Sequence, residues 1–143
     1  MTGGGLIHDE TGTQRLIGYV LDVGQPDRRA RCRLIVDDRH TNRHGVLHGG
    51  LAAVLLDNAS GATASLTVDD SGRAPFLTVS LNTDFLAAGR KGGITATGRI
   101  VGGGRSLLFV SGELVHDDGT LIATSTGVFK RVPGLNVPPT GDA

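Results

Sequence analysis

The pattern of hydrophobic and polar positions predicts one helix and several strands. Residues 49–66 form the only long helical segment, and its first turns are apolar almost all round, which is typical of a helix buried on most sides. Most of the remaining chain alternates with a period of two. In residues 30–36, for example, Arg31 and Arg33 alternate with apolar side chains, which predicts a half-buried strand.

Strands are predicted on both sides of this helix. Two precede it and four follow it, over residues 16–23, 30–36, 77–85, 94–101, 107–116 and 121–130. The pair Asp118-Gly119 between the last two is a strong signal for a hairpin turn. Runs of strands around a single helix favour an α+β fold over a parallel α/β sheet. An antiparallel sheet wrapped around the helix would leave one side open, and a second subunit is a natural candidate to cover it.

Composition excludes several classes of function. The chain has 14 basic and 14 acidic residues, hence no net charge, which speaks against nucleic-acid or membrane partners that bind a basic surface. The apolar run at residues 51–56 is too short to span a bilayer. A single cysteine, Cys32, excludes a disulfide framework and fits a cytoplasmic location. Zero net charge also favours self-association.

The length of 143 residues fits one domain with one core. We place this domain at residues 16–132. Residues 1–15 are rich in glycine and threonine, and residues 133–143 hold three of the five prolines. Both segments are therefore predicted to be flexible.

Asp57 lies two turns into the predicted helix, among apolar neighbours. Ionised carboxylates are rarely buried without a partner. Three explanations are open: the side chain reaches solvent at an edge, it pairs with an arginine, or it is a functional carboxylate.

The residues before this helix are suited to bind an electron-rich oxygen. Gly49 and Gly50 stand at the predicted helix start, where backbone N–H groups lack helical partners and the helix dipole is positive. Such an end can polarise a carbonyl and stabilise an oxyanion. Alternatively, the two glycines only permit a tight joint between loop and helix.

Loop and helix together carry a motif with the spacing Asn42-x-x-Gly45-x-x-His48-Gly49-Gly50, then Asp57 nine residues after His48. This motif resembles the PaaI-like, phenylacetate-pathway branch of the hotdog-fold acyl-CoA thioesterases. The resemblance extends over about residues 16–131, because the predicted strand order also matches. It implies a hotdog fold, in which an antiparallel β-sheet wraps around one long central helix.

The resemblance also implies catalytic roles for five residues. Asp57 would act as nucleophile or general base on the thioester, and the N–H of Gly49 would polarise the thioester carbonyl. Asn42 and His48 would position the thioester or the attacking water. Thr78, on the strand after the helix, would assist the carboxylate.

Four further residues are candidate contacts for the substrate and its CoA moiety, namely Gly50, Arg90, Lys91 and Arg105. The three basic residues stand in or beside glycine-rich turns, where they are suited to bind phosphates. Basic residues at turns are also often simply solvated.

Helix geometry indicates that two subunits share each site. Gly49 and Asp57 are eight residues apart, or about 12 Å along a helix axis. A carbonyl and its attacker must approach to about 3–3.5 Å. We therefore expect a homodimer in which Gly49 of one subunit faces Asp57 of the other. The resemblance implies the same arrangement, often within a homotetramer.

These observations predict hydrolysis of an aryl or medium-chain acyl-CoA thioester to the free acid and CoA, without a cofactor. No metal site is expected, because His40, His44 and His48 would share a face only on a helix, and the glycines around them argue against one. Two alternatives remain open. One is a non-catalytic acyl-CoA-binding or regulatory module of the same fold, and the other is a hotdog enzyme of the enoyl-CoA hydratase type.

Overall fold

The computed structural model describes residues 3–135 of the chain. Its elements, in chain order, are the 3-10 turn η1 (Gly3–Gly5), β1 (Leu6–Ile7), α1 (Gly12–Ile17), β2 (Val20–Asp22), β3 (Arg31–Val36), the 3-10 turn η2 (Asp38–His40), α2 (Gly49–Ser65), β4 (Phe76–Phe85), β5 (Gly92–Gly103), β6 (Leu107–His116) and β7 (Leu121–Arg131).

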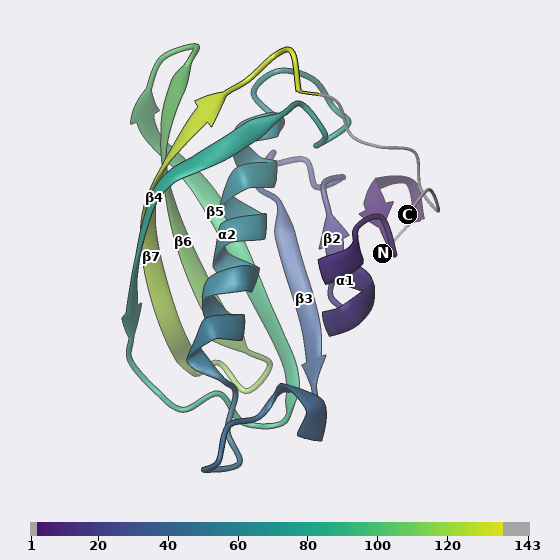
Figure 1. The fold of residues 1–143 in the computed structure, drawn as a ribbon, viewed down its shortest axis with the longest axis vertical. Coiled ribbons are helices and arrows are strands. Elements are labelled where there is room, and N and C mark those ends of the chain that lie inside the picture. Colours follow the sequence, from purple (N-terminus) through teal and green to yellow (C-terminus); the bar gives the residue numbers. More distant parts are fainter. Residues whose placement is uncertain (1–2, 136–143) are drawn as a thin grey trace.

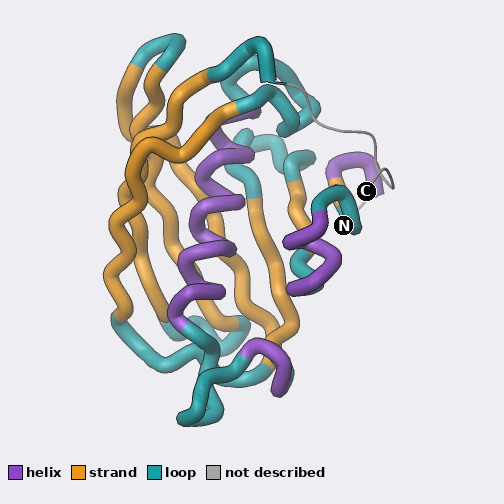
Figure 2. Tube along the Cα trace, viewed as in Figure 1, coloured by secondary structure: helices purple, strands orange, loops and turns teal. Residues whose placement is uncertain are grey.

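The strands form one antiparallel sheet in the order β1-β2-β3-β5-β6-β7-β4. The sheet curves around α2, which lies along its concave face (Figures 1 and 2). The predicted α+β hotdog fold is therefore confirmed. Within residues 3–135, no helix is both long enough and apolar enough to cross a membrane.

Two glycines allow α2 to lie close to the sheet. Gly98 and Gly112 are paired across β5 and β6, and both face the helix. A Cβ atom at Gly98 would lie only 2.5 Å from the hydroxyl oxygen of Thr63 and 2.8 Å from the carbonyl oxygen of Ala59. The absence of side chains at these positions lets Ala59 and its helical neighbours become completely buried.

The N-terminal segment has more structure than the sequence predicts. Within residues 1–15, expected to be flexible, β1 pairs with β2 and α1 begins. Gln14 is buried and donates hydrogen bonds to the carbonyl oxygens of Ile7 and Tyr19. The strand predicted over residues 16–23 is shorter, since α1 continues to Ile17 and the left-handed Gly18 ends it. These contacts join elements that sequence periodicity does not connect.

At the other end, the chain is described as far as Leu135, so most of the C-terminal segment predicted to be flexible lies outside the described residues.

β4 is an edge strand, with β7 as its one neighbour in the sheet. The alternation in this segment predicts a half-buried strand, yet in one chain the apolar side chains of Leu77, Val79 and Phe85 are 52%, 59% and 59% exposed. An exposed edge with apolar side chains is a surface suited to another chain.

Candidate active site

The carboxylate of Asp57 is held by the neighbouring edge strand. Helix α2 carries Asp57 half-buried beside β4, where the hydroxyl group of Thr78 donates a hydrogen bond to its Oδ1 at 2.6 Å. A hydrogen bond to an ionised acceptor is among the stronger ones and fixes its orientation. The structure thus brings together two of the five predicted catalytic residues.

Asp57 is not a member of a structural ion pair. None of the ion pairs formed among residues 3–135 includes it. Asp57 and Thr78 instead line a cavity of about 240 Å³. Of the three explanations for this residue, the pairing with an arginine is therefore not observed, and the carboxylate faces open space.

The start of α2 presents one free amide. His48 caps the helix, and its Nδ1 accepts a hydrogen bond from the N–H of Gly50 at 2.9 Å. The N–H groups of the next two residues donate to the carbonyl oxygen of His48. In the described part of the chain, the N–H of Gly49 has no such partner. Gly49 can therefore donate to a ligand, whereas the amide of Gly50 is engaged by His48.

The loop before α2 is organised by polar side chains. The side-chain Oδ1 of Asn42 accepts a hydrogen bond from the backbone N–H of His44 at 2.9 Å. The backbone N–H of Asn42 donates to the carbonyl oxygen of Val46. Gly45 closes this turn with a φ of 74°. Asn42 thus shapes the loop, and its contact with a substrate stays a prediction.

The three histidines spaced four residues apart, His40, His44 and His48, do not form a cluster. His40 is buried, with its Nε2 at 2.8 Å from the carbonyl oxygen of Ile17, while His48 caps α2 and His44 is exposed. Across residues 3–135, no three His, Cys, Asp or Glu side chains cluster in a way that would hold a metal ion.

The predicted phosphate contacts lie at two ends of the molecule. The N–H of Leu47 donates to the carbonyl oxygen of Gly89 at 2.7 Å and Lys91 pairs with Asp38, so Arg90 and Lys91 lie at the same end as the start of α2. Arg105 stands in the turn between β5 and β6, at the opposite end of the sheet (Figure 1). One chain therefore does not bring Arg105 to the other two.

Several residues that line the Asp57 cavity are not predicted from the sequence. Glu10 and Arg73, which form an ion pair, both contribute to its wall, as does Asn58. The hydroxyl group of Tyr19 donates to Asn58 at 3.1 Å, and burial raises the pKa of this phenol. No periodicity or motif points to these residues, since their proximity depends on how the N-terminal segment folds.

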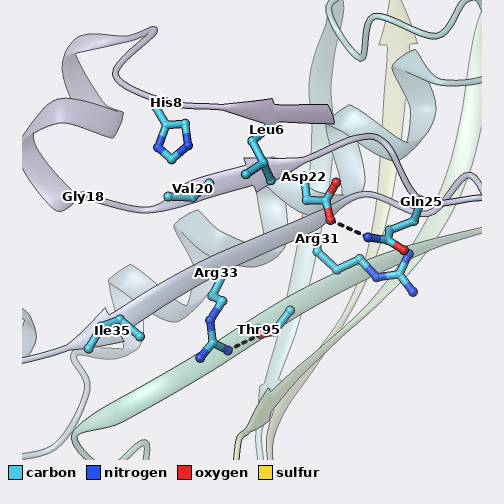
Figure 3. A pocket seen from close by; sticks show the side chains of 10 residues that line it. All are labelled: Leu6, His8, Gly18, Val20, Asp22, Gln25, Arg31, Arg33, Ile35 and Thr95. Atoms are coloured by element: carbon cyan, nitrogen blue, oxygen red, sulfur yellow. Dashed lines mark hydrogen bonds between the residues drawn. The ribbon is translucent and has the colours of Figure 1, made fainter. Parts of the chain in front are cut away.

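A larger cavity lies elsewhere and carries no residue of the motif. It measures about 540 Å³ and is bordered by β1, β2, β3 and β5 (Figure 3). The candidate active site is therefore not chosen by cavity size but by the hydrogen bond that orients Asp57 and by the free N–H of Gly49.

The single cysteine has no catalytic role in this arrangement. Cys32 is fully buried on β3, and burial raises the pKa of its thiol. A thiol kept protonated in this way is a poor nucleophile.

Fold and site define a hotdog protein with a carboxylate and a free helix-start amide. The sequence profile of the Thioesterase superfamily matches residues 44–123. Acyl-coenzyme A thioesterase 13 of Homo sapiens is 34% identical over 112 residues, which cover 77% of this chain and 78% of the human protein. The chain therefore belongs to the thioesterase superfamily, a family of thioester hydrolases, and is of the PaaI-like hotdog type.

Solved structures agree with this fold. A Bacillus halodurans protein crystallised with CoA superposes with a TM-score of 0.77 at 26% identity, over 87% of this chain and 81% of that one. The E. coli PaaI protein from the phenylacetic acid degradation operon gives a TM-score of 0.71 at 23% identity, covering 85% of each chain.

Proposed function

We propose that this protein hydrolyses an acyl-CoA thioester to the free acid and CoA, with Asp57 as the attacking or activating carboxylate. The observation that carries the proposal is the orientation of Asp57 by Thr78 at the edge of a cavity, in a chain whose helix start offers a free amide at Gly49. Membership of the thioesterase superfamily supports the reaction class. The name of the human relative and the CoA in the Bacillus halodurans structure support the substrate class.

The proposed chemistry needs only these groups and water. As a general base, Asp57 removes a proton from water while the water oxygen attacks the thioester carbon. The carbon–sulfur bond then breaks, and CoA leaves as a thiolate that takes up a proton. As a nucleophile, Asp57 would instead attack the thioester carbon and expel the CoA thiolate, and water would then hydrolyse the resulting acyl anhydride to the free acid and the Asp57 carboxylate. In both routes the N–H of Gly49 donates to the developing oxyanion.

We propose that the active unit is a homodimer with two shared sites. Within one α2, Gly49 and Asp57 are separated by about 12 Å, because each residue adds about 1.5 Å. This separation is too large for both groups to act on one carbonyl. The exposed apolar residues of β4, at the free edge of the sheet, support a two-fold contact there. Such a contact would also cover the open side of α2, and two dimers would form a tetramer.

We place the CoA moiety at the start of α2. A cavity of about 310 Å³ there is lined by Arg39, His48 and Gly50, and Arg90 and Lys91 lie at the same end. These basic side chains are the proposed phosphate contacts, with Arg105 contributed by another subunit. The acyl group, aryl or medium-chain, would point into the Asp57 cavity. We also propose that the protein is cytoplasmic.

Replacement of Asp57 by asparagine tests the reaction. The Asp57→Asn variant keeps the shape and the bond from Thr78 but can neither accept a proton nor attack, so we expect kcat to fall at least about 100-fold. The assay measures thiol released from a panel of acyl-CoA esters. Asp70→Asn is the matched control, since the Asp70 side chain is 92% exposed, and it should leave kcat unchanged.

Undiminished turnover by Asp57→Asn would contradict the assignment. Tight binding of a CoA ester without any thiol release by the native protein would favour the non-catalytic binding module. Loss of ultraviolet absorbance from an enoyl-CoA, without thiol release, would favour the hydratase.

A further inference from the structure

The cavity beside Asp57 is bounded by an N-terminal residue that lies outside the segment matched by the superfamily profile. Residues 44–123 match the profile, whereas Glu10 precedes α1 and still lines this cavity. Two phenylalanines, Phe76 on β4 and Phe129 on β7, form an apolar part of the wall. The N-terminal segment is therefore part of the site and not only a flank of the fold.

An ion pair joins this segment to the loop before β4. The Nε of Arg73 donates to Oε2 of Glu10 at 2.5 Å, and both side chains line the cavity. The Glu10 side chain is only 19% exposed, against 48% for Arg73. Its backbone N–H is held by the side chain of buried Gln14 at 3.0 Å. Glu10 is thus anchored by Gln14, and the ion pair holds the Arg73 side chain against it.

The pair lies at the end of the cavity far from the reacting carboxylate. The α2 residues that line the cavity begin at Asp57 and end at Ser65, a span of about 12 Å at about 1.5 Å per residue. The hydroxyl group of Ser65 donates to the carbonyl oxygen of Ala74 at 2.6 Å, which ties the loop carrying Arg73 to this end of the helix. A chain that enters beside Asp57 therefore meets Glu10 and Arg73 last.

We propose that the Glu10–Arg73 ion pair is the distal wall of the acyl-binding cavity and limits the length of the acyl group. This inference rests on the proposed thioesterase function. The space beside Asp57 measures about 240 Å³. An acyl chain that follows α2 from Asp57 toward Ser65 reaches the ion pair, and a longer chain must displace it.

Acyl-chain selectivity is the test. The native protein, Glu10→Ala and Arg73→Ala are compared by kcat/KM on CoA esters from butanoyl to hexadecanoyl. We expect each variant to raise the ratio of long-chain to short-chain kcat/KM by about tenfold, since excluding even one methylene changes kcat/KM by about 10–200-fold. The double variant Glu10→Arg with Arg73→Glu restores a pair of reversed polarity and should return the ratio toward the native value.

A substitution on α2 shifts selectivity in the opposite direction. Gly61 lines the same cavity, and a Cβ atom there would lie 3.8 Å from the ring of Phe129, an ordinary contact. Alanine is also a better helix former than glycine, so Gly61→Ala should fold well. Its added methyl group narrows the cavity and should lower the ratio of long-chain to short-chain kcat/KM by about tenfold.

A control variant and two contradicting outcomes complete this test. Asp117→Asn breaks the ion pair with Arg33 on the other side of the sheet and should leave the ratio unchanged. Turnover by the native protein with an unchanged ratio in Glu10→Ala and Arg73→Ala would overturn this inference alone. No turnover of any CoA ester by the native protein would overturn the proposed function and this inference with it.

Discussion

At the scale of single residues, the hydroxyl group of Thr78 orients Asp57, the carboxylate on which the proposed chemistry depends. Thr78→Val keeps the shape and the β-branched side chain but removes the donor to Asp57. Hydrogen bonds to charged groups contribute about 1.5–3 kcal/mol, so we expect kcat for thiol release to fall about tenfold or more. Thr78→Ser keeps the hydroxyl group and should retain most of the activity. Equal rates in the native and Thr78→Val proteins would show that this bond has no catalytic part.

The site residues that can be predicted from the sequence are those with a signal in a short stretch of chain. Asp57 stands out because a carboxylate in an apolar helix is rare, and Gly49 because glycines at a helix start leave N–H groups free. The motif resemblance predicts Thr78, whereas its contact with Asp57 depends on the fold. Glu10 and Arg73 are 63 residues apart, and no local pattern predicts that they meet.

At the scale of elements, the helix start is the feature to test. Proline is well tolerated as the first helical residue because the N–H it lacks has no helical partner there. The preceding residue, His48, has the extended backbone that proline requires, with φ −62° and ψ 128°. Gly49→Pro therefore removes the free amide with little change to α2.

We expect Gly49→Pro to lower kcat about 10²–10³-fold, the usual effect of losing one oxyanion donor. Gly49→Ala is the matched control, since it keeps the N–H and adds only a Cβ atom at 3.3 Å from the ring of Phe85. Circular dichroism checks that α2 is intact in both variants. Comparable loss in both variants would mean that packing against Phe85 matters and the amide does not.

Elements were predicted well where their periodicity is strong and local. Strand β6 has the predicted bounds, and α2 ends within one residue of its predicted end, because alternation and an apolar helix are readable in a short window. The periodicity of the sequence does not predict the two-residue strand β1. It is stabilised by pairing with β2 and by the buried amide of Gln14, and neither contact is local in the sequence.

At the scale of the whole molecule, the proposed dimer follows from the exposed sheet edge and the incomplete site of a single chain. One edge of the sheet carries exposed Leu77, Val79 and Phe85, and the two proposed catalytic groups, Gly49 and Asp57, are too far apart in one α2 to act on one carbonyl. A charged residue in this edge should separate the subunits. We expect Val79→Lys to shift the protein to the monomer in analytical ultracentrifugation and to lose thiol release together with the dimer. A fully active monomer would contradict the shared site.

Mixing two inactive variants tests the shared site directly. Each site in the proposed dimer takes Gly49 from one subunit and Asp57 from the other. In a hybrid of Asp57→Asn and Gly49→Pro chains, one of the two sites therefore receives both native groups. Random pairing of equal amounts makes half of the dimers hybrid, so co-refolded chains should regain roughly a quarter of the native specific activity. If each chain instead supplied both groups to its own site, every site in the mixture would lack one of them, and the mixture would stay as inactive as its components.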